Sequence, residues 1–252
     1  MQLFYSKDIT PNGFCTLDAE ESRHAVRVLR MREGDTINVT DGRGNLYQCT
    51  IINASDKSCV VSDAIVISLP FTPSHSLSLP QIHLAVAPTK NPARMEWLVE
   101  KAVEIGVGEI TLLQCDHSER SFLKTERLEK LAVSAMKQSL HTVLPTINPP
   151  VKLSEWLSQA FRQSGTQVLK LIAHCEADKP RTPLAAALQP GRDAVVLIGP
   201  EGDFSEEEIQ LALECGFTPV SLGPSRLRTE TAALYAVTAF NLLNDTIGSE
   251  RE

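Results

Sequence analysis

The chain has 252 residues, of which 42% are hydrophobic and 22% charged, so it can form one large domain or two smaller ones with a buried core. Its 24 Lys and Arg residues against 31 Asp and Glu residues give a net charge of -7. That charge excludes a protein that holds nucleic acid by bulk positive charge, but it allows a local basic patch. No run of about 18 apolar residues and no signal peptide are present, which excludes a membrane span and favours a cytoplasmic protein.

The six cysteines lie far apart in the sequence and form no CxxC or CxH pair. Such spacing is not that of a zinc knuckle or of a disulfide scaffold. We therefore expect free, mostly buried thiols in a reducing compartment. The histidines show no ligand spacing either, and we predict no metal site.

The beginning of the chain predicts a small β-rich module over residues 1–70. Short β-branched runs alternate there with turn-forming residues such as Asp41 and Gly42, which is typical of a small antiparallel barrel or sheet. One helix-like interruption is expected within residues 18–34. The β-branched runs occupy 36–52, 59–66 and 65–69.

Residues 68–80 hold three prolines and four serines and carry no formal charge. This composition resists both a helix and a central strand, so it indicates a linker, which we place at 71–80. After the linker, over 81–252, apolar strands alternate with helices of moderate length, which predicts an α/β domain with a parallel sheet. The expected strands are 81–87, 109–114, 167–175, 193–199 and 219–223, and the expected helices are 93–106, 125–140, 205–216 and 230–245.

In open parallel sheets a ligand lies beyond the carboxyl ends of the strands, and two loops there have unusual sequences. The first is 197–205, Leu-Ile-Gly-Pro-Glu-Gly-Asp-Phe-Ser. Ser205 and Glu208 predict a capping box at the start of the next helix. Gly199 and Gly202 permit a close approach of the backbone or a positive φ. No phosphate-binding glycine motif is present, so a nucleotide polyphosphate is not expected.

The second loop is 222–232, Leu-Gly-Pro-Ser-Arg-Leu-Arg-Thr-Glu-Thr-Ala, before the last helix. Thr229 or Thr231 suits the helix cap, and Glu230 suits the positive end of the helix dipole. Arg228 has no such structural role, because a cation is unfavourable at a helix N-terminus. We expect it to meet an anionic or electron-rich substrate; the alternative is a surface salt bridge with Glu230.

Together the two loops resemble the trefoil-knot (SPOUT) methyltransferases, and more narrowly the bacterial 16S rRNA (uracil-N3)-methyltransferases of the RsmE type. The resemblance extends over nearly the whole chain. Residues 23–30 fit that family's N-terminal PUA-like β-barrel, and 90–106 match one of its central signatures. Three motifs depart from the family pattern. Asp203 replaces a usual glycine, Leu140-His141 replaces a usual Gly-Arg, and Arg226 replaces an aliphatic residue.

The resemblance implies a C-terminal knotted domain that binds S-adenosylmethionine in three loops. The knot would also account for the absence of a dinucleotide-binding glycine fingerprint in an α/β methyltransferase sequence. The implied cofactor-binding residues are Leu171, Ala173 and His174 in the first loop, Ile198, Gly199, Glu201 and Gly202 in the second, and Leu222, Gly223, Leu227 and Arg228 in the third.

The implied reaction is methylation of N3 of one uridine, 1498 in the usual rRNA numbering, in small-subunit 16S ribosomal RNA. We hypothesise that Arg228 stabilises negative charge on a uracil carbonyl oxygen. Glu230 would be its orienting partner or the base. The resemblance also implies a homodimer, acting on the RNA or on the assembled 30S subunit.

The arginine segment, residues 23–32, carries four arginines and no acidic residue. On a helix, Arg23, Arg27 and Arg30 would share one face, which predicts contact with RNA phosphates. A merely solvated helix face is the alternative. The predicted RNA-binding residues are Arg23, Arg27, Arg30 and Arg32.

Other functions remain open from the residues alone. One is a non-catalytic RNA-binding protein whose knot has lost its cofactor, which the Asp203 and His141 departures favour. A small-molecule α/β enzyme is disfavoured by the arginine segment. A related methyltransferase could instead act on another RNA base or on a ribose 2′-hydroxyl.

Overall fold

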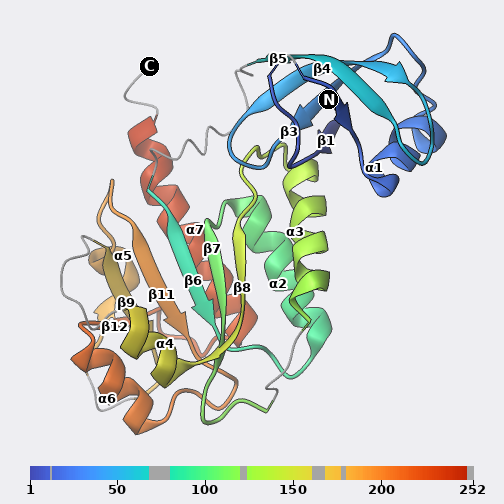
Figure 1. Ribbon diagram of the computed structural model, residues 1–252. Coiled ribbons are helices and arrows are strands. Elements are labelled where there is room, and N and C mark those ends of the chain that lie inside the picture. The colour runs from blue at the N-terminus through green and yellow to red at the C-terminus, as the bar shows by residue number, and fades with distance from the viewer. Residues whose placement is uncertain (12, 68–79, 120–123, 161–167, 177–179, 249–252) are drawn as a thin grey trace. The chain divides into compact units, whose positions relative to one another are not determined.

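The computed structural model describes residues 1–11, 13–67, 80–119, 124–160, 168–176 and 180–248 (Figure 1). The chain folds into two compact units. The first comprises Met1–Ser78 and Val133–Leu144, and the second comprises Leu79–Ala132 and Pro145–Glu252. The first unit thus includes a segment that the sequence pattern assigns to the second domain. Of the predicted linker at 71–80, residues 71–79 lie outside the described residues.

The first unit contains a five-stranded sheet in the order β1-β3-β4-β5-β2. The pair β1–β3 is parallel and the other pairs are antiparallel, so the sheet is not purely antiparallel as expected. A parallel pair needs a long crossover, which the chain between β1 and β3 provides. Its strands are β1 (Leu3–Tyr5), β2 (Cys15–Thr16), β3 (Thr36–Thr40), β4 (Leu46–Asn53) and β5 (Val60–Val66).

The predicted run 36–52 divides into β3 and β4 at a tight turn. Gly42 has a φ of +72°, and Asp41 accepts a hydrogen bond from the Arg43 backbone N–H at 2.8 Å. Such a turn is expected of an Asp-Gly pair. Strands β1 and β2 were not predicted, because three and two residues are too short for an alternating pattern to stand out.

The segment Val133–Leu144 joins the first unit through polar contacts. The Thr40 hydroxyl donates to the Thr142 carbonyl at 3.0 Å, and the Lys137 ammonium forms an ion pair with the buried Glu21 carboxylate. These contacts join residues about a hundred positions apart. No local sequence pattern predicts them.

The predicted helix through the arginine segment is wrong in part. An α-helix, α1 (Ala19–Arg23), widens into a π-helix, η1 (His24–Val28), and the Leu29 N–H donates to the His24 carbonyl at 3.0 Å. Arg30 then has a φ of +59°, the left-handed conformation in which helices end. Arg30 therefore does not share a continuous helical face with Arg23 and Arg27.

The second unit contains a seven-stranded sheet in the order β10-β12-β9-β11-β6-β7-β8. Every pair is parallel, which confirms the predicted α/β class. Of the predicted strand 167–175, residue 167 lies outside the described residues. The strands are β6 (Ile82–Val86), β7 (Glu109–Gln114), β8 (Thr146–Lys152), β9 (Leu169–Ala173), β10 (Thr182–Pro183), β11 (Ala194–Ile198) and β12 (Thr218–Ser221).

Strand β8 was not predicted because it contains Pro149 and Pro150. It lies at the end of the sheet, where it pairs with β7 through an irregular register. Proline is tolerated on such an edge strand because one side of the strand needs no hydrogen-bond donors. The small elements α4 (Leu153–Ala160) and α5 (Leu184–Ala187) were also not predicted.

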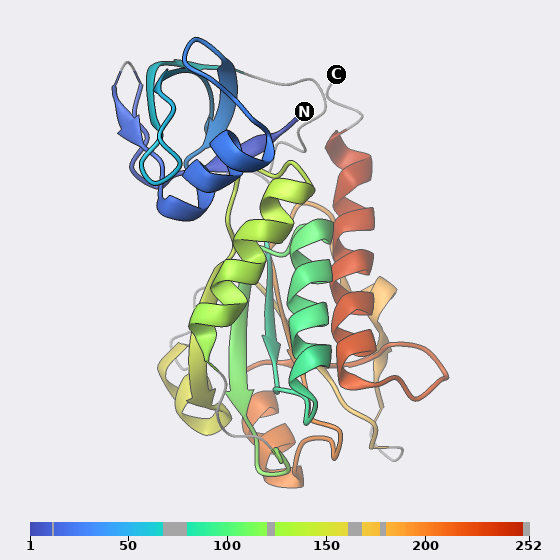
Figure 2. The ribbon, with the colours of Figure 1, turned by 90° about the vertical axis from the view of Figure 1, so that its right-hand side faces the viewer.

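Helices cover both faces of this sheet. On one face α7 packs against α2, β6 and β11, and Figure 2 shows α2 in green beside α7 in red. On the other face α4 packs against α6. No helix in the described ranges is long and apolar enough to span a membrane. The main helices are α2 (Pro92–Ile105), α3 (Thr125–Gln138), α6 (Glu206–Glu214) and α7 (Thr229–Gly248).

Candidate functional site

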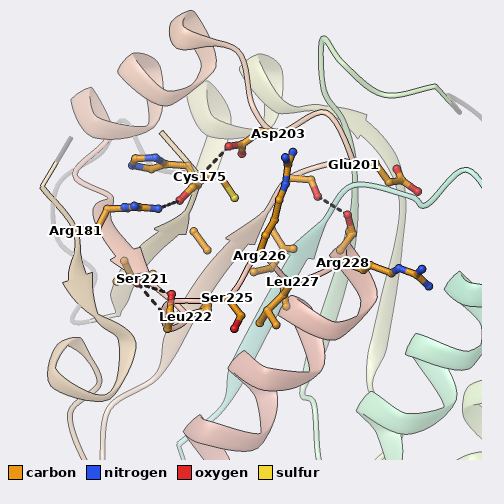
Figure 3. A pocket seen from close by; sticks show the side chains of 18 of the residues that line it. Cys175, Arg181, Glu201, Asp203, Ser221, Leu222, Ser225, Arg226, Leu227 and Arg228 are labelled. Atoms are coloured by element: carbon orange, nitrogen blue, oxygen red, sulfur yellow. Dashed lines mark hydrogen bonds between the residues drawn. The ribbon is translucent and has the colours of Figure 1, made fainter. Parts of the chain in front are cut away.

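A pocket of about 340 Å³ lies at the carboxyl ends of β9, β11 and β12 in the second unit (Figure 3). Small-molecule sites typically enclose a few hundred Å³ or more, and in open parallel sheets they occur at this edge. The pocket is formed by the segments that follow the three strands, at His174, Gly199 and Leu222.

The structure brings the three predicted cofactor loops together. All but two of the predicted residues line the pocket. Leu171 is instead buried within β9, and Gly202 packs against His117. The predicted residues that line the pocket are Ala173, His174, Ile198, Gly199, Glu201, Leu222, Gly223, Leu227 and Arg228.

A hydrogen bond joins two glycine-proline bends of the pocket, the first bend at 199–203 after β11 and the second bend at 223–228 before α7. Thr229, the first residue of α7, donates from its hydroxyl to the Gly199 carbonyl at 3.1 Å, and both groups are buried. The sequence pattern suggests a helix cap at Thr229. Its hydroxyl in fact ties the loop before α7 to the loop after β11, so the position of the second bend depends on the first.

The predicted capping box at the start of α6 is confirmed. The Glu208 N–H donates to the Ser205 hydroxyl at 3.2 Å, and the Ser205 N–H donates to the Glu208 carboxylate at 2.9 Å. Asp116, after β7, accepts a hydrogen bond from the Ser205 hydroxyl at 2.7 Å. The loop after β11 therefore ends at a helix start that is anchored to the end of β7, two strands away in the sheet.

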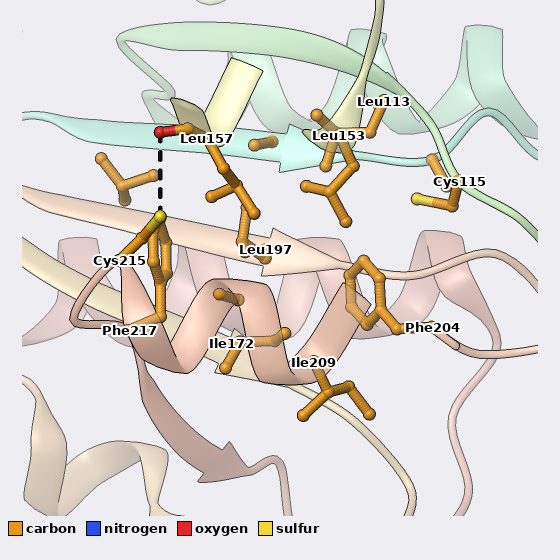
Figure 4. Packing of buried hydrophobic residues seen from close by; sticks show 14 residues of the cluster. Leu113, Cys115, Leu153, Leu157, Ile172, Leu197, Phe204, Ile209, Cys215 and Phe217 are labelled. Carbon is orange, nitrogen blue, oxygen red and sulfur yellow. Dashed lines mark hydrogen bonds between the residues drawn. The ribbon is translucent and has the colours of Figure 1, made fainter. Parts of the chain in front are cut away.

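The glycines of the first bend serve packing within the protein. A Cβ at Gly199 would lie 3.1 Å from the Phe204 ring, which is buried in the core between the sheet and α6 (Figure 4). A Cβ at Gly202 would lie 3.1 Å from the His117 Cβ. The residue of this bend with a left-handed backbone is Asp203, with a φ of +66°.

Arg228 lines the pocket and is exposed. Within the described part of the chain its guanidinium forms no ion pair or hydrogen bond, so the surface salt bridge to Glu230 is not formed. In Figure 3 Arg228 and Glu201 lie at one side of the view, and Arg181 and Cys175 lie at the other. Arg228 is thus available to a ligand.

Glu230 is buried and does not belong to the pocket lining. Its Oε1 lies 3.7 Å from Nε of Arg94 on α2, and its Oε2 has no hydrogen-bond partner among the described residues. Arg94, which the sequence motifs did not single out, is therefore the cation that pairs with this carboxylate in the described part of the chain. Its position in the stretch 90–106, which matches a family signature, was the available signal.

Arg181 and Cys175 are among the lining residues that the sequence did not predict. Arg181 donates from Nη1 to the His174 carbonyl at 2.6 Å and so holds the end of β9. Cys175 exposes its thiol to the pocket. Burial raises the pKa of the Cys175 thiol above its ordinary 9.0, as does the Asp203 carboxylate, against the opposing effect of Arg226 and Arg181. The thiol is therefore protonated near neutral pH and is a poor nucleophile.

Glu201 is held at the pocket by the loop that precedes α2. The Lys90 backbone N–H donates to the Glu201 carboxylate at 3.0 Å, and the Lys90 ammonium forms an ion pair with Glu119 at 2.6 Å. This hydrogen bond to Glu119 raises the pKa of Lys90. The loop after β11 is therefore also supported by the segment between β6 and α2.

The chemistry of the lining suits a ligand with a flat apolar part and a charged end. Apolar surface comes from Ala173, Ile198, Leu222 and Leu227. Gly223 has a φ of +108° and no side chain, so its backbone is open to a ligand. Side chains of both signs surround this surface: Arg181, Arg226 and Arg228 against Glu201 and Asp203. An adenine ring joined to a zwitterionic amino acid has matching features.

In the first unit the four predicted RNA-binding arginines, Arg23, Arg27, Arg30 and Arg32, are all exposed. Arg27 forms an ion pair with Asp56, which lies outside the arginine segment. Surface pairs of this kind contribute little to stability and exchange readily for other anions. The segment therefore presents positive charge to solvent, partly neutralised at Arg27.

The chain matches two protein-family models. Residues 76–241 match an RNA methyltransferase domain, and residues 17–63 match an RNA methyltransferase PUA domain. Ribosomal RNA small subunit methyltransferase E of Buchnera aphidicola is 29% identical over 96% of this chain and 93% of that protein.

Solved structures are similar over nearly the full length. A "probable rRNA-methyltransferase" from Porphyromonas gingivalis is 41% identical with a TM-score of 0.83, covering 98% of this chain and 100% of that one. Ribosomal RNA small subunit methyltransferase E from Neisseria gonorrhoeae, bound to S-adenosyl methionine, is 26% identical with a TM-score of 0.78, covering 97% of this chain and 98% of that one.

Proposed function

Because this chain belongs to the ribosomal RNA small subunit methyltransferase E family, with PUA and RNA methyltransferase domains, we propose that it methylates N3 of one uridine in small-subunit 16S ribosomal RNA, using S-adenosylmethionine. The observation that carries this proposal is the joining of three distant loops into one pocket, in which Arg228 is exposed and lacks a partner among the described residues.

The pocket lining supports the choice of methyl donor. Ala173, Ile198 and Leu222 offer apolar surface for the adenine. Arg181 and Arg226 offer positive charge for the methionine carboxylate, which leaves Arg228 to the substrate. Bound S-adenosylmethionine supplies a methyl group that is already activated on a sulfonium. The protein then has to orient the two reactants and to ease the loss of one proton.

Arg228 is the proposed catalytic residue. The uracil N3–H is a weak acid, and its nitrogen becomes nucleophilic only as the proton leaves. A guanidinium beside the uracil carbonyl stabilises the negative charge that then develops on oxygen. In the balance of the reaction the nitrogen gains the methyl group, the sulfonium becomes a thioether, and the proton passes to solvent.

Glu230 is better assigned to positioning than to proton transfer. Its carboxylate is buried behind the lining beside Arg94 and does not reach the pocket surface. Glu230 follows Thr229, whose hydroxyl holds the Gly199 carbonyl. The pair Arg94–Glu230 therefore fixes the start of α7, and with it the backbone that carries Arg228.

The first unit would hold the RNA. The arginine segment offers exposed guanidinium groups to phosphates without requiring a basic protein. Family membership supports small-subunit RNA, as free RNA or within the 30S subunit, as the substrate, and a homodimer as the working form. We place the protein in the cytoplasm, where that RNA is found.

Two measurements test the proposal. Calorimetry with S-adenosylmethionine should give one binding event per chain, whereas a degenerate pocket should give no heat. Mass spectrometry of small-subunit RNA, from cells with and without the protein, should show one N3-methyluridine that depends on it. Methylation of a ribose or of another base would replace the proposed target, and no change in the RNA would favour a non-catalytic binding protein.

A further inference from the structure

Asp203 combines a left-handed backbone with a side chain that lines the pocket. At its φ of +66° glycine carries the least strain, and among other residues Asp and Asn are the most tolerated. The RsmE-type methyltransferases usually have glycine at this position. Glycine alone would satisfy the backbone, so the carboxylate is an addition that the turn itself does not require.

Both oxygens of this carboxylate accept hydrogen bonds from backbone N–H groups. Oδ1 accepts from Phe204 at 2.9 Å, and Oδ2 accepts from Cys175 at 2.6 Å. Phe204 is the next residue in the chain, but Cys175 follows β9, 28 positions away. Figure 3 shows the bond between Asp203 and Cys175 bridging two of the loops that form the pocket.

The turn that carries Asp203 is itself held in place. The Asp203 N–H donates to the Pro200 carbonyl at 3.0 Å, and α6 begins at the capping box two residues later. The segment after β9 is held through its backbone as well. Arg181 donates to the carbonyl of His174, and Asp203 accepts from the N–H of Cys175. Two charged side chains therefore hold consecutive backbone groups of this pocket wall.

We propose that Asp203 is a positioning residue for the methyl donor, because its carboxylate fastens the segment after β9 to the turn after β11 and so fixes one wall of the cofactor pocket. The identity of the ligand rests on the proposed function. The link between the two loops is a property of the protein without ligand.

Calorimetry with S-adenosylmethionine tests the role in binding. Asp203→Gly keeps the backbone conformation available and removes the carboxylate. We expect it to raise the Kd about tenfold, since a charge-assisted hydrogen bond that preorganises the wall is lost. At saturating cofactor, kcat should stay within about twofold, because the reacting groups are unchanged. Wild-type affinity in this variant would overturn the proposal.

Two further variants separate the link from charge and folding. Asp203→Asn tolerates the left-handed backbone and keeps one acceptor oxygen, so its Kd should lie between those of the wild type and the glycine variant. It also remains informative if the glycine variant folds poorly. Glu207→Gln removes the same charge from an exposed position on α6 and should leave the Kd unchanged. An equal loss there would make the effect one of net charge and overturn the proposal.

Hydrogen exchange at the Cys175 amide, measured without any cofactor, tests the link independently of function. This amide should exchange slowly in the wild type and about tenfold faster in Asp203→Gly, because its acceptor is gone. Unprotected exchange in the wild type would overturn the link. If the wild type bound no S-adenosylmethionine while this exchange still depended on Asp203, the proposed function and the cofactor role of Asp203 would fail and the link would stand.

Discussion

The loops around the pocket are tied to one another by hydrogen bonds, whereas the arginine segment of the first unit is open to solvent. In the pocket, Thr229 holds Gly199 and Asp203 holds Cys175. In the arginine segment, Arg27 forms a surface pair with Asp56. The difference agrees with the two roles that we propose, because a cofactor site benefits from a preorganised cavity, while phosphates along an RNA strand require accessible charge.

The largest effect is expected at Arg228, and it tests whether the pocket is the catalytic site. Arg228→Ala should lower kcat about 10²- to 10³-fold, since charge on the uracil oxygen loses its partner. The Kd for S-adenosylmethionine, measured by calorimetry, should stay within about twofold. Arg228→Lys should recover part of kcat, because it keeps the charge without the planar guanidinium. Normal methylation by the alanine variant would remove Arg228 from the catalytic role.

The open arginine segment is tested by charge reversal. The double variant Arg27→Glu, Arg30→Glu should weaken binding to small-subunit RNA about tenfold or more. It should also reduce the slope of log Kd against log salt by roughly 1 to 2, because fewer counterions are released. Fluorescence anisotropy over a salt series measures both. Lys152→Glu, an exposed reversal in the second unit, serves as the control. An unchanged slope in the double variant would place the RNA elsewhere.

The ion pair between Arg94 and the buried Glu230 should act as a unit. Glu230→Gln keeps the volume and removes the charge, and Arg94→Ala removes the partner cation. Each should lower kcat about tenfold by loosening the start of α7, and the double variant should lose little more than either single one. Steady-state kinetics on all four proteins gives this coupling. Independent, multiplicative losses would show that the two residues do not act through each other.

The smallest expected effect concerns the anchoring of the first bend. Ser205→Ala removes the cap of α6 and should lower the free energy of unfolding by about 1 kcal/mol, measured by urea denaturation. Ser158→Ala, on the exposed side of α4, should change it by less than about 0.5 kcal/mol. If Ser205→Ala abolished cofactor binding while the protein remained folded, the bend would depend on its cap far more than proposed.

Much of the second unit could be predicted because its signals are local. Alternating apolar strands and helices identify a parallel sheet, and Ser205 with Glu208 marks a helix start within four residues. A parallel sheet then gathers the strand ends at one edge, so loops far apart in sequence could be expected to meet. The edge strand β8 was not predicted, because its two adjacent prolines oppose strand formation everywhere except at the edge of a sheet.

In the arginine segment the sequence predicted the exposure of the side chains but not the course of the backbone. Its composition predicted exposed positive charge, and all four arginines are exposed. Its geometry was predicted wrongly at Arg30, because the helix widens into a π turn and ends before that residue. The position at which a helix ends depends on which backbone carbonyls find hydrogen-bond donors. The spacing of the charged residues does not reveal this.

The α/β class, the family and the loops that form the pocket could all be predicted from the sequence, since each is marked by a motif of residues near one another in the chain. The folded chain was needed to find that Arg94 approaches Glu230, that Asp203 holds the Cys175 N–H, and that residues 133–144 belong with the first unit. These contacts join distant positions, and the order of strands and the course of the backbone between them determine which distant groups come within hydrogen-bond distance.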